Sequence, residues 1–291
     1  MNLAIKKYGM VREKTIGETL SFEGIGIHTG EKTRIVLHPE EEGKGVRFYK
    51  EGIFIPANYR FVVNTNHSTD LGREGVVIKT VEHLLAVLHL LEITNLTVEV
   101  KGPEIPILDG SGQEFYEVLK DSTVYQNREI EYFEIKDTVE ILNGKAYVKA
   151  EPSESLEITY EGEFNNFLGK QSFTFLEGNE EEIVLARTFC FDWEIEYIKK
   201  AGLGKGGSLE NTLVLGKEKV YNPDGLRFKD EPVRHKVFDI VGDLYLLGKP
   251  VKGKIYSFRG GHSLNYKLVK KLAEIEKSQR LKIKEVAQYT A

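Results

Sequence analysis

The order in which strand and helix patterns arrive restricts the fold of this chain more than any other feature of its sequence. Residues 16–63 contain short β-rich runs separated by glycine turns. An amphipathic helix is predicted at 80–91, with Thr80 as its N-cap, and a strand follows at 95–100. A turn rich in proline and glycine then leads to a helix from about residue 113.

The second half repeats this pattern of elements without repeating residues. Five β-rich segments, the last at 181–191, precede helices at 192–201 and 233–247, a strand at 253–260 and a helix from residue 262. Because the strands arrive in runs rather than alternating with helices, the sequence predicts an α+β fold.

A polar segment separates the two halves. Its sequence, DSTVYQNREI at 121–130, breaks both the helical and the strand periodicity. We therefore expect a linker here, between a first α+β domain at 1–126 and a second at 127–291. The first 15 or so residues precede the first matched strand and are given no role.

Composition and charge exclude several classes of protein. The chain has 40 Lys and Arg against 45 Asp and Glu, a net charge of −5, so it lacks the basic excess of a generic nucleic-acid binder. Its one cysteine, Cys190, excludes a disulfide framework and any cysteine-based zinc or iron–sulfur site. The longest apolar run, 84–91, falls far short of the roughly 20 residues that span a bilayer. The N-terminus lacks the apolar stretch of a secretory signal, so we expect a soluble, cytoplasmic protein.

The predicted helix VRHKVFDIVGDLYLL carries the strongest chemical signal. His235, Asp239 and Asp243 lie at i, i+4 and i+8 on one face of a helix that is otherwise largely apolar. An imidazole and a carboxylate one turn apart can bind one divalent ion. Burial of these groups would be costly unless their charges were compensated. The alternative is a set of surface salt bridges with Arg234 and Lys236.

A catalytic zinc site needs a third protein ligand and an open position for water. His83 and His89 lie six residues apart, so they point to different sides of one helix and cannot serve the same ion. His83 is preferred because Glu82 stands beside it, where a general base could act; His89 is expected in the core or at the surface. His262 follows two glycines at the start of a helix, as a candidate general acid or as part of a helix-capping loop.

Eight motifs, in order along the chain, together resemble a known family. The family is the zinc-dependent UDP-3-O-acyl-N-acetylglucosamine deacetylases of Gram-negative lipid A biosynthesis. The motifs cover most of the chain from about residue 20 to 272, and eight ordered motifs are far more specific than any one of them. They are GIGIHTG (24–30), NTNHSTDLG (64–72), KTVEHLLAVLHLL (79–91), EIPILDGSG (104–112), LARTFCF (185–191), GLGKGGSLENTLV (202–214), EPVRHKVFDIVGDLYLLG (231–248) and GGHSLN (260–265).

The resemblance implies a zinc metalloamidase that removes the N-acetyl group and releases acetate, the committed step of lipid A biosynthesis. His83, His235 and Asp239 are then expected to bind one zinc ion per chain, with water at the fourth position and Fe²⁺ as a substitute metal. Glu82 is expected to take a proton from that water as it attacks the acetamide carbonyl.

The resemblance also assigns the acid side of the reaction. His262, kept protonated by Asp243, would stabilise the oxyanion and protonate the leaving amine, and Thr188 would donate a hydrogen bond to the oxyanion. A neighbouring carboxylate raises the pKa of an imidazole, so activity should be bell-shaped in pH, with Glu82 and His262 governing the two limbs.

The substrate implied by the resemblance is a UDP-linked, acylated glucosamine. Lys236 would contact it, the uracil would pack on Phe164, and His28 and His67 would have auxiliary roles. A hydrophobic passage at about 189–214 would take the acyl chain; without the resemblance, its apolar residues indicate a core segment. These residues include Phe189, Phe191, Trp193, Ile195 and Ile198.

The implied architecture is two α+β domains, each a layered β-α-α-β sandwich, with the active site at the interdomain interface. The 152 residues between His83 and His235 (235 − 83) agree with ligands drawn from both halves. A monomer is expected, with no nucleic-acid partner and no transmembrane segment.

Two rival functions use the same residues. One is a zinc amidohydrolase of this architecture that acts on another N-acyl sugar or on a peptide, without the passage or the uridine pocket. The other is a non-catalytic protein with structural zinc, which would need a fourth protein ligand. The sequence shows no suitable fourth residue near the three.

Overall fold

A computed structural model describes residues 9–164 and 167–289, with side chains as far as residue 281. Its first half contains the strands β1 (Met10–Ile16), β2 (Leu20–Ile25), β3 (Lys32–Pro39), β4 (Val46–Lys50), β5 (Ile53–Pro56), β6 (Val62–Asn64), β7 (Asp70–Arg73), β8 (Val76–Ile78) and β9 (Leu96–Lys101). The helices of this half are η1 (Tyr59–Phe61), a 3₁₀ turn, α1 (Glu82–Leu90) and α2 (Gln113–Ser122).

The second half follows the same plan. Its strands are β10 (Thr123–Glu131), β11 (Phe133–Glu134), β12 (Val139–Asn143), β13 (Ala146–Glu151), β14 (Leu156–Glu163), β15 (Lys170–Leu176), β16 (Phe189–Phe191), β17 (Leu213–Leu215) and β18 (Val251–Phe258). Its helices are α3 (Glu181–Val184), η2 (Asp192–Glu194), α4 (Ile195–Lys200), α5 (Glu231–Leu244), η3 (Tyr245–Leu247) and α6 (His262–Tyr289). The α+β class predicted from the sequence is confirmed.

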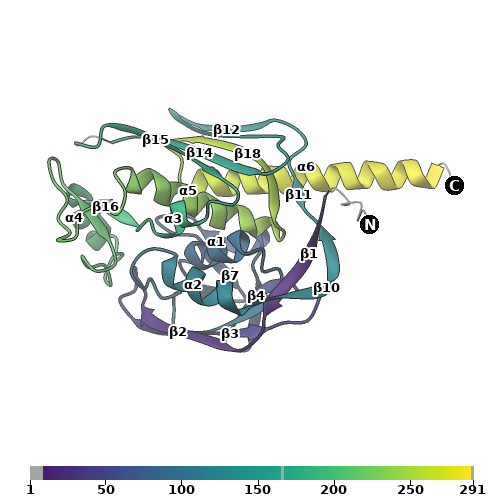
Figure 1. Cartoon of the computed structure of the whole chain (residues 1–291), viewed down its shortest axis with the longest axis horizontal. Helices are drawn as coiled ribbons and strands as arrows, with labels where there is room; N and C mark the ends of the chain where they lie inside the picture. Colours follow the sequence, from purple (N-terminus) through teal and green to yellow (C-terminus); the bar gives the residue numbers. More distant parts are fainter. Residues whose placement is uncertain (1–8, 165–166, 290–291) are drawn as a thin grey trace, which may run out of the picture.

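Two large sheets enclose a layer of helices. Figure 1 shows α1, α2, α5 and α6 between a sheet ordered β2-β3-β9-β4-β5 and one ordered β12-β13-β18-β14-β15. Along this order each sheet has one parallel pair, β4 with β9 and β14 with β18, and its other pairs are antiparallel. Strand β11 adds a further parallel pair, with β18. Alternate residues of the strands are buried, as in β14, so each sheet turns one apolar face toward the helices. Among the described residues, no helix combines the length and the hydrophobicity that crossing a membrane requires.

The predicted linker is wrong. Residues Thr123–Glu131 form β10, which pairs antiparallel with β1 from Met10↔Glu131 to Ile16↔Thr123. The strand is polar because most of its side chains face solvent, so its sequence lacks the apolar alternation of a half-buried strand. The part of the N-terminal extension that the structure describes therefore pairs with β10 as β1, and the expected domain boundary at 126/127 lies within a strand.

The predicted strand at 181–191 is also wrong over most of its length. Residues Glu181–Val184 form the short helix α3, and only Phe189–Phe191 are extended, as β16. Two acidic residues occupy the first turn of α3, where the helix dipole favours negative charge, and Ile183 and Val184 are buried. The apolar run therefore packs as a helical turn.

Thr80 is not the N-cap of α1. The cap is Val81, without a side-chain cap bond, and Thr80 adopts φ +57°, which is rare for a β-branched residue. Its hydroxyl donates instead to buried Glu104, at 2.6 Å. The same carboxylate accepts the backbone N–H groups of His28 and Thr29. Glu104 thereby joins the loop before β3 to the start of α1.

Helices α1 and α5 approach so closely that only glycine fits at their crossing. A Cβ on Gly242 would lie 2.1 Å from the carbonyl oxygen of Glu82 and 3.2 Å from the amide nitrogen of Ala86. All of α1 from Glu82 to His89 is buried, as is α5 from Val237 to Leu244. The crossing lies in one continuous apolar core that spans both halves of the chain.

His89 is a core residue that links three elements. Its Nδ1–H donates to the carbonyl oxygen of Val241 at 2.8 Å, and its Nε2 accepts the N–H of Val251 at 3.1 Å. Both bonds require the neutral imidazole, and burial lowers the pKa of His89 to about 4.

We expect Gly242→Ala to destabilise the fold. Alanine favours an isolated helix by about 1 kcal/mol over glycine, but here its methyl group would collide with backbone atoms that cannot move aside. The free energy of unfolding, measured in urea, should fall by about 1–3 kcal/mol or more. Gly261→Ala is the matched control, since no heavy atom lies within 4 Å of its added Cβ, and should stay within about 1 kcal/mol of wild type. Equal stabilities of the two variants would contradict the close crossing.

We expect His89 to make stability depend on pH. In the unfolded chain it binds a proton below about pH 6.5, whereas the folded chain resists that proton down to about pH 4. Its contribution is therefore complete above pH 6.5 and is lost as pH falls toward 4, by on the order of 3 kcal/mol. Urea unfolding of wild type and His89→Gln between pH 7.5 and 4.5 should show a smaller decline in the variant. Parallel curves would show that His89 contributes nothing to this decline.

Candidate metal centre

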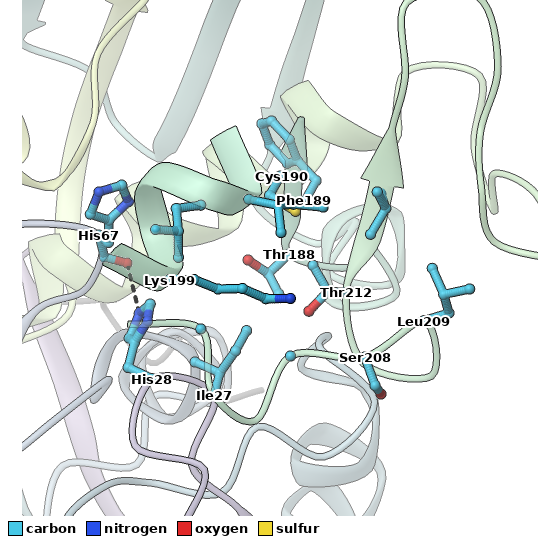
Figure 2. Close-up of a pocket in the computed structure, with 15 residues that line it drawn as sticks. Ile27, His28, His67, Thr188, Phe189, Cys190, Lys199, Ser208, Leu209 and Thr212 are labelled. Carbon is cyan, nitrogen blue, oxygen red and sulfur yellow. Dashed lines mark hydrogen bonds between the residues drawn. The ribbon is translucent and has the colours of Figure 1, made fainter. Parts of the chain in front are cut away.

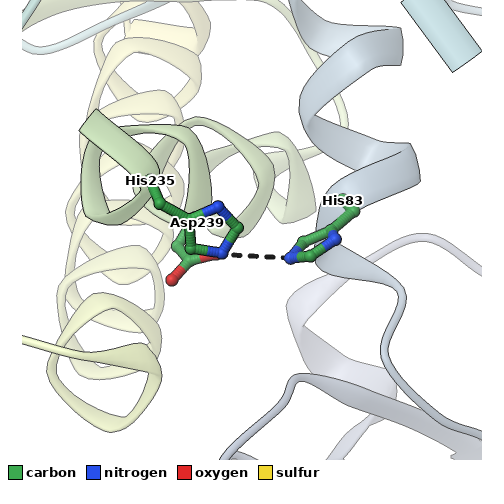
Figure 3. Close-up of side chains that lie close together, drawn as sticks. All are labelled: His83, His235 and Asp239. Carbon is green, nitrogen blue, oxygen red and sulfur yellow. Dashed lines mark ion pairs between the residues drawn. The ribbon is translucent and has the colours of Figure 1, made fainter. Parts of the chain in front are cut away.

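Three side chains from the two halves of the chain meet where α1 and α5 cross. His83 is the second residue of α1, and His235 and Asp239 lie one turn apart on α5. Figure 3 shows the three side chains pointing toward one another across the gap between the helices. One nitrogen or oxygen atom from each lies within 4.8 Å of the others, and all three residues are buried.

The geometry directs two imidazoles at one carboxylate oxygen. Asp239 Oδ1 lies 3.3 Å from His235 Nε2 and 3.7 Å from His83 Nε2. His235 Nδ1–H donates to the carbonyl oxygen of Ala186 at 2.9 Å, which directs its Nε2 toward Asp239. Burial lowers the pKa of both histidines, to about 3 for His83, so both are neutral, the form that binds metals.

The donor set fits a bound cation. Within the described part of the chain, buried Asp239 Oδ1 has no hydrogen-bond partner, and two neutral imidazole nitrogens face it. Burial raises the pKa of Asp239, but the positive charges of Lys236 and His262 outweigh burial and lower it, so the carboxylate is ionised. A divalent ion would satisfy this oxygen and both nitrogens at once.

Two titratable groups lie beside this centre. Glu82 Oε1 is 3.7 Å from His262 Nε2, and burial raises the pKa of Glu82 to about 8. His262 Nδ1–H donates to Asp243 Oδ2 at 2.8 Å. Burial opposes the charge on His262, but Asp243 dominates and raises the imidazole pKa to about 10. Asp239 and Asp243 are buried, so the alternative of surface salt bridges is wrong in its location, although Asp239 does form an ion pair with Lys236, at 2.9 Å.

Sequence reasoning missed two residues of this cluster. Thr69 donates its hydroxyl to Asp243 Oδ1 at 2.6 Å and its N–H to Glu82 Oε2 at 3.0 Å. Asn265 Nδ2 donates to Asp243 Oδ2 at 2.8 Å. Asn265 could have been found, since it follows His262 by three positions on α6 and so shares its face. Thr69 lies in a matched motif, but its sequence alone carries no signal for this contact.

A pocket of about 290 Å³ is lined by residues from both halves of the chain. Figure 2 shows Thr188 and Phe189 on one wall and His28 on another, with the carbonyl group of His67 near His28. Ile195 also lines it. Thr188 follows Ala186, the partner of His235, by two residues, so the pocket wall and the metal centre share one segment.

The other expected substrate residues lie near this pocket. Phe164 and Phe191 pack on Phe189, with ring centroids 6.1 and 5.9 Å away. Phe191 also stacks on half-exposed Trp193, at 4.6 Å. Lys236 Nζ donates to Asp239 Oδ2 at 2.9 Å and lies 5.5 Å from the centre of the Phe189 ring. Lys236 therefore links the donor set to the pocket.

Comparison with known proteins identifies the family of the chain. The family model described as UDP-3-O-acyl N-acetylglycosamine deacetylase matches residues 13–274. The UDP-3-O-acyl-N-acetylglucosamine deacetylase of Aquifex aeolicus (strain VF5) is 69% identical over 268 residues, which cover 92% of this chain and 95% of that protein. Proteins of the same name are 39% identical in a Nitratiruptor species, over 91% of both chains, and 38% identical in Helicobacter pylori (strain J99 / ATCC 700824), over 89% of this chain and 90% of the relative. The chain therefore belongs to the UDP-3-O-acyl N-acetylglycosamine deacetylase family.

Proposed function

We propose that the chain hydrolyses the acetamide of UDP-3-O-acyl-N-acetylglucosamine and releases acetate, a step of lipid A biosynthesis. The convergence of His83, His235 and Asp239 beside Glu82 and His262 carries this proposal. The relatives bear the name of that activity, and the chain matches them over nearly their whole length.

The resident cation is zinc, with Fe²⁺ as a substitute, held by His83, His235 and Asp239. Two imidazoles and one carboxylate are a ligand set typical of catalytic zinc, whereas structural zinc takes four protein ligands. The donor group found among the described residues has three members. When bound there, zinc acts as a Lewis acid toward the acetamide carbonyl and makes water nucleophilic near neutral pH.

Glu82 is the general base. The N–H of Thr69 occupies its Oε2, which leaves Oε1 facing His262 across the site. Burial holds the pKa of Glu82 near 8, and a general base is most effective when its pKa lies close to the pH of the reaction. Glu82 accepts a proton from the attacking water and carries it during the reaction.

His262 is the general acid. Its Nδ1–H is committed to Asp243, so Nε2–H is the proton directed into the site. The raised pKa keeps the ring charged at neutral pH, and the charge stabilises the oxyanion before the proton passes to the leaving amine. Thr188 donates a further hydrogen bond to that oxyanion.

The pocket takes the acyl chain. Its lining includes Phe189 and Ile195, and the Phe189 ring lies 5.5 Å from Lys236 Nζ, which donates to Asp239 of the donor set. Lys236 contacts the substrate, the uracil packs on Phe164, and His28 and His67 line the opposite side. All these residues come from one chain, and we propose that the enzyme acts as a monomer.

We expect purified protein to hold about one zinc ion per chain, measured by elemental analysis. Loss of a residue that hydrogen-bonds to a metal ligand lowers metal affinity roughly 10- to 100-fold. Loss of the ligand itself, in His83→Ala, should therefore lower zinc affinity by more than this. Chelation should abolish acetate release, and added Zn²⁺ or Fe²⁺ should restore it. His38→Ala, which removes a histidine on the outer face of β3, is the matched control and should keep its zinc. Full zinc occupancy in His83→Ala would exclude this residue as a ligand.

We expect Glu82→Gln and His262→Gln each to lower kcat by roughly 10²- to 10⁴-fold, because each removes one proton transfer. Zinc content should stay at the wild-type level. In wild type, kcat/KM should rise with pH as Glu82 loses its proton and fall at high pH as His262 loses its own, and each variant should lose one limb. Glu99→Gln, at a surface carboxylate, is the control. Near-normal turnover of both zinc-loaded variants would overturn the assignment.

A further inference from the structure

Thr69 lies between the two groups that would move protons. It is 1% exposed and directly precedes β7. Its N–H donates to Glu82 Oε2 at 3.0 Å, and its carbonyl oxygen accepts the N–H of Val81 at 3.0 Å. These two bonds attach the segment to the first residues of α1.

The hydroxyl of Thr69 reaches the opposite helix. It donates to Asp243 Oδ1 at 2.6 Å, and its oxygen lies 3.3 Å from His262 Nδ1. Asp243 Oδ2 accepts the Nδ1–H of His262 and the side-chain amide of Asn265, both at 2.8 Å. With donors on both of its oxygens, the carboxylate of Asp243 has one orientation, and that orientation sets the plane of the His262 ring.

The backbone around Thr69 is itself fixed by a carboxylate. Asp70 Oδ1 accepts the hydroxyl of Ser68 at 2.8 Å and the N–H of Thr80 at 3.1 Å, and its Oδ2 accepts the amide of Asn64 at 2.9 Å. These bonds fix the backbone next to Thr69, and the fixed backbone determines where the Thr69 hydroxyl lies.

We propose that Thr69 is a positioning residue that holds Glu82 and the His262–Asp243 pair in register across the substrate amide. The inference rests on the proposed function. A general base and a general acid must face the same carbonyl from fixed places, and displacement by about 1 Å costs roughly 100-fold in rate. Thr69 contacts the carboxylate of Glu82 through its backbone and that of Asp243 through its side chain, so one residue fixes the positions of both carboxylates.

The test compares Thr69→Val, which keeps the side-chain shape but removes the hydroxyl, with Thr69→Ser, which keeps the hydroxyl. Loss of a hydrogen bond to a charged group should lower kcat of Thr69→Val roughly 10- to 100-fold, with KM and zinc content near wild type. Thr69→Ser should recover most of that loss. Thr94→Val is the matched control, since Thr94 is buried and its hydroxyl contacts only Lys14 and Asn95 among the described residues.

A second measurement does not depend on turnover. The Nδ1–H of His262 should give a slowly exchanging proton resonance in wild type, Thr69→Ser and Thr94→Val. It should exchange at least tenfold faster in Thr69→Val, where Asp243 Oδ1 loses its donor and only Oδ2 is still held. Wild-type kcat and exchange in Thr69→Val would overturn the proposal, as would equal losses in Thr69→Val and Thr69→Ser. If wild type releases no acetate from the substrate, the proposed function fails, and the exchange measurement still decides whether Thr69 positions His262.

Discussion

The close crossing of α1 and α5 determines the position of every group in the metal centre. Gly242 lets the backbone of α5 touch the carbonyl of Glu82, and His83 follows in the next position. His235 and Asp239 lie on the same helix as Gly242, within two turns of it. A wider crossing would separate one ligand from the other two, and Glu82 from His262. Packing of the two halves and assembly of the site are therefore one event.

Burial of this crossing also decides the charge of each group. The site lies inside the helix layer between two sheets, where an uncompensated charge is costly. His83 and His235 respond by staying neutral, whereas His262 is charged because Asp243 contacts it. Three histidines in one site thus have two different charge states. Which state each one has depends on the carboxylate that it faces and on its distance from that carboxylate.

The sequence predicts the elements whose apolar residues recur at a clear helical or strand spacing. It does not predict elements whose side chains mostly face solvent, because these lack that spacing. Helix α5 was predictable because its apolar residues surround a few charged ones. Strand β10 was not, because most of its side chains face solvent and it carries no alternating apolar face. Thr80 is the type of residue that caps helices, yet its hydroxyl contacts Glu104, 24 positions away. A contact between residues so far apart in the sequence cannot be predicted from the spacing of neighbouring residues.

The same division applies to the candidate site. The pair His235 and Asp239 follows from helical spacing alone, since i and i+4 share a face. His83 is preferred over His89 because of its neighbour Glu82 and the family motif. The fold gives the two histidines different partners: His83 faces the carboxylate of Asp239, whereas His89 bonds to two backbone groups. Thr69 could not be predicted, because its role depends on which side chains two distant helices bring to it. Chemistry that depends on residue type and spacing can be found in a sequence, whereas the hydrogen bonds that orient it require the tertiary structure.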